Sequence, residues 1–374
     1  MNLLQDQLDS LCEKKLLRTL SPFSPTGGVL RGKFKNRPVI NFSSNSYLGL
    51  DNDRELKNKL IEAVEKTTIS SEASRLITGT GKKMLSFEKK LASWKKTEAA
   101  LVFNSGYMAN VGIIPALSDR HTDIFADKLS HASIIDGAHL SRASFRRFRH
   151  LDVKHLEKLL KSSSASRKIV VTDSIFSMDG NIAPLNDMKN ICKKHNAFFI
   201  VDEAHATGVR GPEGRGLCSE EGISGPEIIQ MGTFSKAMGL MGAYAAASET
   251  VIRYLVNKAR SFIFTTALPP YMPYVMEKSV EIVRSSRGEK MRSILQKHIE
   301  KLKSCGFYSG THIVPLKQNS TSKTMEKHRE LLEKGILGLP IRPPTVPHGT
   351  SRIRISLSAG HTENEVNKLC KTLS

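Results

Sequence analysis

The stretch FIVDEAHATG places an aspartate and a histidine, Asp202 and His205, three residues apart. Its centre spells D-E-A-H, the tetrapeptide by which one helicase family is named, and the whole chain has a formal net charge of +20. Aspartate and histidine are also common metal ligands and common acids and bases in catalysis. Three kinds of chemistry are therefore open: nucleotide hydrolysis, metal binding, and catalysis with an organic cofactor.

The helicase interpretation requires a phosphate-binding loop of the form G-x-x-x-x-G-K-[ST]. The nearest segment is RLITGTGKKML, in which Leu76 stands where the first glycine is required and Lys83 replaces the hydroxyl that binds magnesium. The basic residues are spread along the chain with acids between them, and the densest patch, Arg146 to His150, is short. The sequence therefore disfavours a nucleic-acid-binding ATPase, and we expect no nucleic-acid partner.

A metal site and a membrane segment are also disfavoured. D-x-x-H is a weak signal, and no third ligand accompanies it, so we expect no metal. The five cysteines are scattered without a C-x-x-C pair, which favours a reducing compartment, and we expect a cytoplasmic protein. No stretch approaches the roughly eighteen apolar residues that a membrane span needs.

Short apolar runs alternate with amphipathic segments through the middle of the chain. The runs are ALVF, DIFA, KIVVTD, AFFIVD and EIIQMG, and their flat hydrophobicity is typical of strands buried on both faces. Between them, MLSFEKKLASWKK, DVKHLEKLLKS and LNDMKNICKKH have helical periodicity. We therefore expect an α/β fold, with a mainly parallel sheet sandwiched by helices in a large domain and a smaller C-terminal α+β domain.

The expected domain boundaries follow changes in this pattern. Residues 1–45 read as an amphipathic helix and an extended segment, residues 46–270 as a large cofactor-binding domain, and residues 271–374 as a small domain. The small domain is predicted to begin with a long helical run from Met272 to about Lys303. Thr362 and Glu365 have the spacing of a capping box and predict the start of a last helix.

Functional side chains are expected after the predicted strands, because ligands of open α/β sheets bind beyond the carboxyl ends of the strands. The segments in question, in chain order, contain Ser105, Gly106 and Tyr107 at a helix entry, then His131, Ser177, Asp202 with His205, and finally Thr233, Ser235 and Lys236. A glycine-containing turn that enters a helix is suited to binding phosphate through backbone amides.

Pyridoxal phosphate would use all of these groups together. Lys236 can form the Schiff base, and Asp202 can keep the pyridine nitrogen protonated so that the ring accepts electrons. His131 can stack on the ring, and His205 with Ser177 can hydrogen-bond the phenolic oxygen. The phosphate can be held by Ser105, Gly106, Tyr107, Thr233 and Ser235.

The motifs NSGYMANVG, DKLSHASIIDG, FSMDGNIAPL, VDEAHATGVRGPEGRG, GTFSKAMG and IRPPTVPHGTSRIRIS resemble those of the α-oxoamine synthases. These are pyridoxal-phosphate enzymes of the aspartate aminotransferase fold, or fold type I. The resemblance extends from SSNSYLGL near position 45 to SRIRISLSAGHT near position 360. IRPPTVP followed by G-T-x-R-x-R is most similar to the members that condense L-alanine with a pimeloyl thioester in biotin biosynthesis.

The resemblance implies roles for individual residues. Lys236 would form the Schiff base and take the Cα proton, and His131 would stack on the ring and polarise the acyl carbonyl. Asn45 would contact the substrate, and Arg354 would hold the amino-acid carboxylate with its planar guanidinium. Thr265 matches a residue that in relatives reaches the phosphate of the neighbouring subunit, which implies a homodimer with active sites at the interface. The acyl donor would be an acyl-CoA or an acyl carrier protein, and the basic surface would speed its encounter.

One segment departs from the family. Ser70 to Arg75 reads SSEASR, where relatives usually have G-[ST]-G-G-S-R, so Glu72 places a side chain and a negative charge where backbone normally approaches the substrate. Drift in a loop and a changed substrate both explain this departure. The alternative function is therefore a related synthase that uses glycine or serine, similar to 2-amino-3-ketobutyrate CoA ligase.

Overall fold

The structure is a computed structural model, and it describes residues 2–374. Its contacts divide the chain into two units. The larger unit comprises Asp53–Phe176 and Ile182–Arg292, and the smaller comprises the chain through Asn52, Ser177–Asn181 and Ser293–Ser374. The boundaries expected from the sequence stay a prediction. The observed division differs from them in placing the helix Met272–Arg284 in the larger unit.

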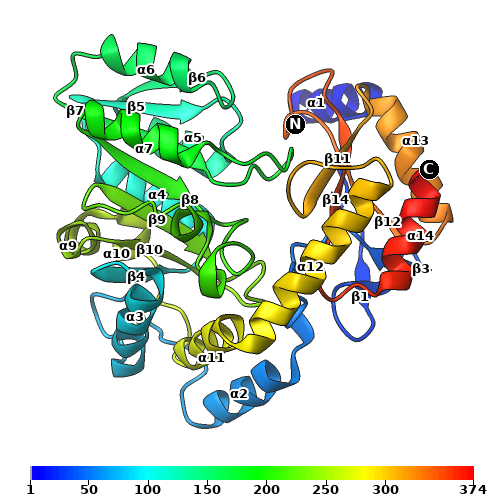
Figure 1. Cartoon of the computed structure of the whole chain (residues 1–374), viewed down its shortest axis with the longest axis horizontal. Coiled ribbons are helices and arrows are strands. Elements are labelled where there is room, and N and C mark those ends of the chain that lie inside the picture. Colours follow the sequence, from blue (N-terminus) through cyan, green and yellow to red (C-terminus); the bar gives the residue numbers. More distant parts are fainter. Residues whose placement is uncertain (1) are drawn as a thin grey trace. The chain divides into compact units, whose positions relative to one another are not determined.

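The larger unit is built on a seven-stranded sheet in the order β4-β10-β9-β8-β7-β5-β6 (Figure 1). The strands are β4 (Ala99–Phe103), β5 (Thr122–Asp127), β6 (Ser144–Phe148), β7 (Arg167–Asp173), β8 (Ala197–Asp202), β9 (Ile228–Thr233) and β10 (Ala243–Ala247). The five strands from β9 to β6 in this order run parallel, and β10 runs antiparallel to both of its neighbours. The predicted, mainly parallel α/β sheet is confirmed.

Two strands of this sheet were not among the predicted runs. SFRRF, which forms β6, carries two arginines, and AYAAA, which forms β10, is mostly alanine, a residue that favours helices. Pairing within the sheet decides their conformation, because local preference alone does not indicate strands there.

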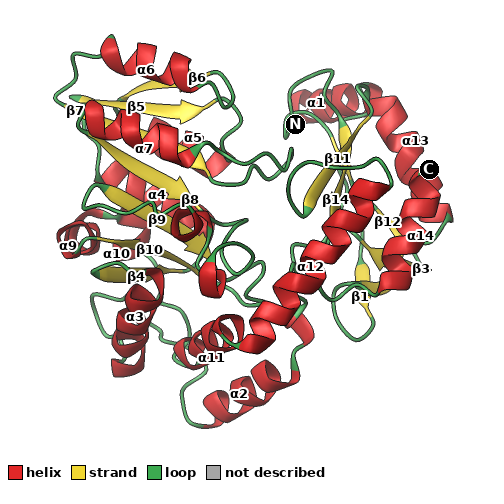
Figure 2. Ribbon diagram, in the orientation of Figure 1, coloured by secondary structure: helices red, strands yellow, loops and turns green. Residues whose placement is uncertain are grey.

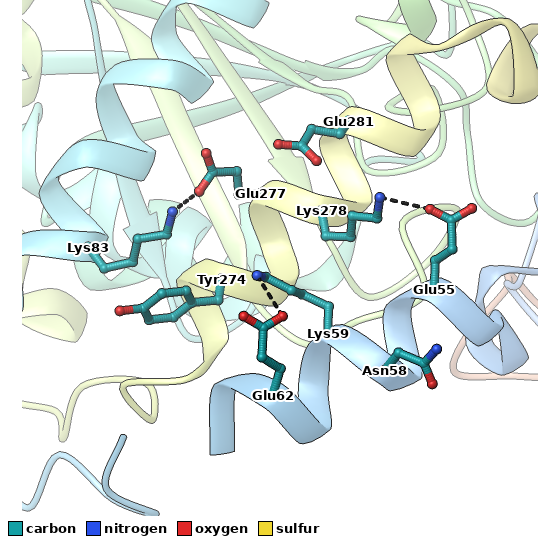
Figure 3. Close-up of a pocket in the computed structure, with 9 residues that line it drawn as sticks. All are labelled: Glu55, Asn58, Lys59, Glu62, Lys83, Tyr274, Glu277, Lys278 and Glu281. Atoms are coloured by element: carbon teal, nitrogen blue, oxygen red, sulfur yellow. Dashed lines mark hydrogen bonds and ion pairs between the residues drawn. The ribbon is translucent and has the colours of Figure 1, made fainter. Parts of the chain in front are cut away.

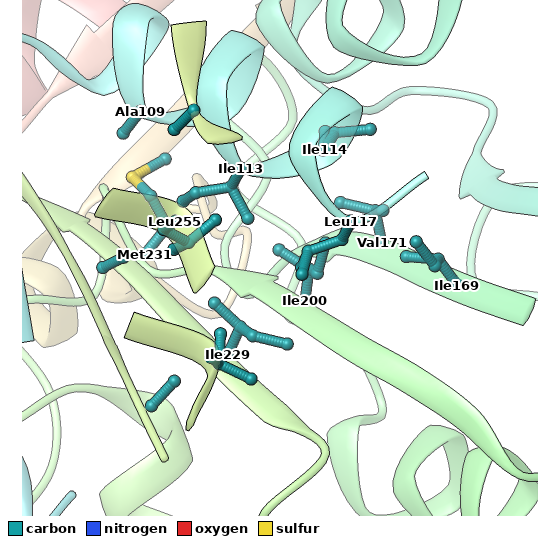
Figure 4. Packing of buried hydrophobic residues seen from close by; sticks show 14 of the residues in the cluster. Ala109, Ile113, Ile114, Leu117, Ile169, Val171, Ile200, Ile229, Met231 and Leu255 are labelled. Carbon is teal, nitrogen blue, oxygen red and sulfur yellow. The ribbon is translucent and has the colours of Figure 1, made fainter. Parts of the chain in front are cut away.

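Helices cover both faces of this sheet (Figure 2). They are α2 (Arg54–Glu65), α3 (Lys82–Lys95), α4 (Gly106–Ala116), α5 (Ala132–Leu140), α6 (Val153–Lys161), α7 (Leu185–Lys194), α8 (Leu217–Glu220), α9 (Glu249–Lys258), α10 (Arg260–Ile263) and α11 (Met272–Arg284), with a 3-10 turn at Pro212–Gly214. On one face, Ile113 of α4 and the C-cap residue Leu117 pack with Ile200 and Ile229 of the strands and Leu255 of α9 (Figure 4). This buried cluster packs α4 and α9 against the central strands of the sheet.

The smaller unit contains two sheets. Their strands are β1 (Phe23–Pro25), β2 (Arg31–Phe34), β3 (Arg37–Asn41) and β12 (Ile336–Leu337) in one sheet, and β11 (Ile313–Lys317), β14 (Arg352–Ser356) and β13 (Pro340–Ile341) in the other. The remaining elements are α1 (Asn2–Glu13), a 3-10 turn (Leu50–Asn52), α13 (Thr321–Glu333) and α14 (Glu363–Leu373), and α12 (Ser286–Ser304) spans the boundary residue of the two units. The predicted capping box of α14 is confirmed, since the side chain of Thr362 accepts from Glu365 and that of Glu365 accepts from Thr362.

The long helix predicted from Met272 to about Lys303 is two helices, so this prediction was wrong in detail. Ser285 has an extended backbone between α11 and α12. A Cβ atom at Gly288 would lie 2.1 Å from the carbonyl oxygen of Val283, so only glycine permits this close turn. Of the helices in the described part of the chain, none combines the length and apolar character needed to cross a membrane.

Candidate active site

Two aspartates end neighbouring parallel strands of the larger unit, where they are paired in register. Asp173 ends β7 and Asp202 ends β8, and both are buried. Burial and the neighbouring Asp202 hold the pKa of Asp173 well above its usual value, so Asp173 favours its neutral form. Asp202 accepts hydrogen bonds from the backbone N–H of Ala204 at 2.9 Å and from Asn110 Nδ2 at 2.8 Å. Asp202 is thus a buried acceptor held in one orientation.

A lysine and a histidine meet next to this strand end. Lys236 follows β9, the strand next to β8, and its Nζ lies 2.8 Å from Nε2 of His205. His205 is buried in the turn after β8, where the backbone N–H groups of Ala206 and Thr207 donate to the carbonyl of Glu203. The structure therefore brings together two of the residues that the sequence analysis selected from different strand ends.

His131 is the N-cap of α5 and has an exposed side chain. Its backbone N–H donates to Asp173 at 3.1 Å, and its Nδ1 lies 2.8 Å from Ser133 Oγ. Partial desolvation lowers the pKa of His131, the Asp202 charge opposes this shift, and the Lys236 charge adds to it. The imidazole is therefore expected to be neutral at neutral pH.

The N-terminus of α4 and the hydroxyls after β9 lie close together. Ser105 is the N-cap of α4 and accepts from the backbone N–H of Met108 at 3.2 Å. A Cβ atom at Gly106 would lie 3.9 Å from Cβ of Thr233, whose Oγ1 is 2.7 Å from Ser235 Oγ. Backbone N–H groups at a helix N-terminus, together with hydroxyls, form an anion site.

Tyr107 contributes to this region through its backbone, because its hydroxyl is engaged elsewhere. The hydroxyl donates to the carboxylate of Asp136, and this hydrogen bond raises the pKa of Tyr107. The side chain is exposed. Thr265, which the resemblance assigns to the phosphate of a neighbouring subunit, is half-buried and lines a small cavity with Arg75 and Asn104.

Asn45 and Arg354 meet within the smaller unit. Arg354, in β14, is buried and donates from one terminal nitrogen to Asn45 Oδ1 at 2.7 Å and to the Tyr47 hydroxyl at 3.0 Å. Burial raises the pKa of Tyr47 to about 12, although the guanidinium opposes this shift. Among residues 2–374, Arg354 Nε finds no hydrogen-bond partner. Ser177 also belongs to this unit, and its predicted contact with the phenolic oxygen stays a prediction.

The loop Ser70–Arg75 keeps a glycine-like backbone. Glu72 has a φ of +51°, in the left-handed region that glycine adopts readily, and its side chain is exposed. Ser71 Oγ donates to the carbonyl of Leu268 at 2.7 Å, and Arg75 forms a buried bidentate pair with Glu88. The exposed carboxylate of Glu72 is therefore the departure from the family. The backbone of the loop is held in place by the contacts of Ser71 and Arg75. A hollow of about 330 Å³ beside the loop is lined in part by Ser70, Lys82 and Pro269.

Glu203, the second acid of the D-E-A-H string, forms a fully buried ion pair. Its Oε2 lies 2.7 Å from Lys95 Nζ, and its Oε1 accepts from the backbone N–H of Cys218 at 2.8 Å. This pair anchors the turn that carries His205 to α3. Glu203 therefore has a structural role in this turn.

A second hollow, of about 480 Å³, lies between α2, α3 and α11 of the larger unit (Figure 3). Its charged side chains pair with one another, as in Lys83 with Glu277 and Lys278 with Glu55. Such paired, solvated charges are usual on a protein surface and are worth little energetically. The residues selected from the sequence lie outside this hollow. Within the described residues, no group of three or more His, Cys, Asp or Glu side chains is arranged to hold a metal ion.

Asn110 and Ser133 also belong to this cluster, although their types and positions in the sequence did not predict it. Both side chains are 0% exposed, and Asn110 Nδ2 donates to Ser133 Oγ at 2.9 Å as well as to Asp202. Asn110 stands in the apolar helix GYMANVGIIPA. A polar amide within such a helix was the sequence signal that could have found it, because buried amides need partners.

Comparisons with known proteins identify the family of the chain. A family model described as aminotransferase class I and II matches residues 37–373. An 8-amino-7-oxononanoate synthase from Citrifermentans bemidjiense is 43% identical over 98% of this chain and 96% of its own length, and one from Geobacter sulfurreducens is 43% identical over 97% and 94%.

Solved structures are similar over nearly the whole chain. A lysine-to-alanine variant of serine palmitoyltransferase from S. paucimobilis, with a bound PLP–myriocin aldimine, has a TM-score of 0.91 at 29% identity, covering 99% of this chain and 95% of that one. The 8-amino-7-oxononanoate synthase of Francisella tularensis has a TM-score of 0.77 at 28% identity, covering 90% and 96%. The chain therefore belongs to the aminotransferase class I and II family and, within it, to the α-oxoamine synthases, as the motifs predicted.

Proposed function

We propose that the chain is an 8-amino-7-oxononanoate synthase, which condenses L-alanine with a pimeloyl thioester in biotin biosynthesis, with loss of carbon dioxide and the thiol. The 43% identity to synthases of this name over nearly the full length supports the substrate assignment. The observation that carries the chemistry is the meeting of Lys236 and His205 beside the buried Asp202.

The residues of the larger unit fit pyridoxal phosphate, the cofactor of this enzyme. Lys236 supplies the amine for the Schiff base, and Asp202 is a buried acceptor for the pyridine N–H. Ser105, Gly106 and the backbone of Tyr107, with Thr233 and Ser235, supply donors for the phosphate. When bound, the cofactor supplies an electron sink for negative charge at the amino-acid Cα.

The side chains then divide the proton transfers. The Lys236 amine takes the Cα proton, and His205 Nε2, at 2.8 Å, lies within hydrogen-bonding distance of that amine. With the cofactor and the thioester bound, His131 would stack on the ring, and its Nε2–H would be the donor to the thioester carbonyl. His205 and Ser177 hydrogen-bond the phenolic oxygen.

Substrate binding is assigned to the smaller unit. Arg354 holds the alanine carboxylate, for which its Nε is a ready donor, and Asn45 orients the guanidinium at 2.7 Å. The active form is a homodimer in which Thr265 reaches the phosphate site of the other subunit. The acyl donor is an acyl-CoA or an acyl carrier protein, and the net charge of +20 speeds the encounter with either anion.

The cofactor assignment is tested by the visible absorption of the purified protein supplied with pyridoxal phosphate. We expect a visible band that Lys236→Ala abolishes. Lys189→Ala is the control and keeps the band, because the side chain of Lys189, which is half-buried on α7, hydrogen-bonds only the carbonyl of Gly222 among residues 2–374. A wild-type protein that never develops the band contradicts the assignment.

The substrate assignment is tested by turnover with pimeloyl-CoA and alanine, glycine or serine in separate assays. We expect alanine to be the preferred amino acid. The exposed Glu72 in place of a family glycine favours the second candidate, a synthase that uses glycine or serine. Turnover with either of these but not with alanine would establish that candidate instead.

A further inference from the structure

Two buried polar side chains connect residues that the proposed function uses separately. Asn110 Nδ2 donates to Asp202 Oδ2 at 2.8 Å and to Ser133 Oγ at 2.9 Å. Ser133 Oγ lies 2.8 Å from Nδ1 of His131. A continuous row of hydrogen bonds, which we name the Asn110 relay, therefore runs from Asp202 through Asn110 and Ser133 to the His131 ring.

The number of hydrogens on each group determines which atom donates and which accepts in each bond of the Asn110 relay. The Asn110 amide nitrogen has two hydrogens, and its two contacts use both. Ser133 Oγ accepts one of them, and its own proton is then directed to His131 Nδ1. The backbone N–H of Ser133 donates to the same Nδ1 at 3.3 Å. Nδ1 is therefore an acceptor, and the ring proton of His131 resides on Nε2.

Packing alone does not explain an asparagine at position 110, because its side chain leaves a buried oxygen unpaired within the described chain. Its Oδ1 is buried and has no hydrogen-bond partner among residues 2–374. An unpaired buried carbonyl destabilises a fold, because the oxygen has lost its hydrogen bonds to water without gaining a partner. The helices approach closely here, since a Cβ atom at Gly137 in α5 would lie 3.0 Å from the Asn110 backbone oxygen. An apolar residue would avoid the unpaired oxygen, so the contribution of this amide is sought in its two donated hydrogen bonds.

We propose that Asn110 is a positioning residue for both sides of the cofactor site. It orients the Asp202 carboxylate toward the pyridine nitrogen. Through Ser133 it also holds His131 in the neutral form whose Nε2–H donates to the acyl carbonyl. This inference rests on the proposed function and adds to it a coupling, through Asn110 and Ser133, between Asp202 and His131.

Cofactor affinity tests the first half of the proposal. Apoprotein is titrated with pyridoxal phosphate, and the dissociation constant is read from the visible band. Asn110→Ala is expected to raise that constant by about tenfold to a hundredfold, the value of one hydrogen bond to a charged group. Ser133→Ala is expected to change it by less than about threefold, because Ser133 does not contact Asp202 directly.

The proposed effect on the protonation of His131 is tested by the dependence of kcat/KM on pH, in particular by the pH at which kcat/KM falls on the acidic side (the acidic limb). The charged groups that act on His131 are Asp202 on β8, Lys236 after β9, Asp136 on α5 and Asp173 at the end of β7. None of these is changed in the variants. Removing the Ser133 hydroxyl removes a donor to neutral His131, so the limb is expected to move up by about one pH unit. Asn110→Ala is expected to move it in the same direction.

Combining the two substitutions distinguishes an effect through the Asn110 relay from a general destabilisation of the fold. In the double variant Asn110→Ala with Ser133→Ala, the acidic limb is expected at the same pH as in the single variant with the larger shift. The two shifts do not add, because both substitutions break the same series of hydrogen bonds. Ser141→Ala is the matched control, since it also removes a hydroxyl hydrogen bond from the end of α5 without touching the Asn110 relay. Its limb and cofactor affinity are expected to match the wild type.

The outcomes distinguish this inference from the proposed function. A wild-type protein that does not bind pyridoxal phosphate contradicts the function itself. A wild-type protein that binds it, with Asn110→Ala and Ser133→Ala within about twofold of it in affinity and with an unmoved limb, contradicts the Asn110 relay alone. Should Asn110→Ala fail to fold, the limb of Ser133→Ala, which loses a single oxygen, decides the question.

Discussion

The end of β8 and the loop Ser70–Arg75 hold their acidic residues in opposite ways. Asp202 and Glu203 are buried, and each carboxylate accepts hydrogen bonds or an ion pair from other parts of the larger unit. Glu72 is exposed, and the loop around it is held by Ser71 and Arg75 instead. The two acids at the end of β8 are thus held by buried contacts. The residue that departs from the family stands where substitution changes charge with little effect on packing.

Lys236→Ala is expected to have the largest effect on activity among changes at the strand ends. It removes the proposed base, and general acid–base catalysis contributes about 10²–10⁴-fold to rates. The measurement is kcat with saturating alanine and pimeloyl-CoA, with circular dichroism as a check on folding. A variant with at least half of the wild-type kcat would falsify the role of Lys236 as the base.

Lys95→Met is expected to have the largest effect on stability, because it leaves Glu203 buried without its partner. Breaking a buried pair from one side costs about 3–5 kcal/mol of unfolding free energy. The double variant Lys95→Met with Glu203→Gln is expected to recover part of that loss. Urea unfolding measures all three proteins, and equal losses in the single and double variants would show that the charge pair is not the cause.

A smaller effect is expected in the pH dependence of catalysis. Desolvation lowers the pKa of His131 from the ordinary value of 6.5, so its neutral, active form persists as the pH falls to that value and is lost only below it. The limb of kcat/KM that belongs to His131 should therefore lie below pH 6.5. His131→Asn, which cannot titrate, should lack this limb. A limb above pH 6.5 that persists in His131→Asn would contradict the assignment of the limb to His131.

Glu72→Gly is expected to have the smallest effect on stability and to sharpen the contrast with the buried acids. Glycine relieves a left-handed backbone cost of about 1 kcal/mol but gains freedom in the unfolded chain, so the net change stays within about 1 kcal/mol. Removal of the charge is expected to lower KM for an anionic acyl donor. Arg75→Ala is the contrasting variant, because it breaks the buried pair with Glu88. A loss as large as that of Arg75→Ala would mean that Glu72 is itself structural.

Much of the larger unit could be predicted because its signals are local. The runs that form β4, β5, β7, β8 and β9 are continuous and apolar, and the polar residues that follow them must gather at one edge of a parallel sheet. β10 was not predicted, because an alanine-rich run has no strand signal of its own. The break between α11 and α12 was also missed, since a serine followed by a nearby glycine does not outweigh the surrounding helical periodicity.

Most elements of the larger unit, the order of the strand-end residues and the family resemblance could be derived from the sequence, because side-chain periodicity and motif spacing are properties of neighbouring residues. Only the tertiary structure decided which distant residues meet. Asn110 and Asp202 are 92 positions apart and Lys95 and Glu203 are 108 positions apart, yet each pair is in contact. A buried polar atom must find its partner wherever the fold supplies one, and no spacing along the chain announces that choice.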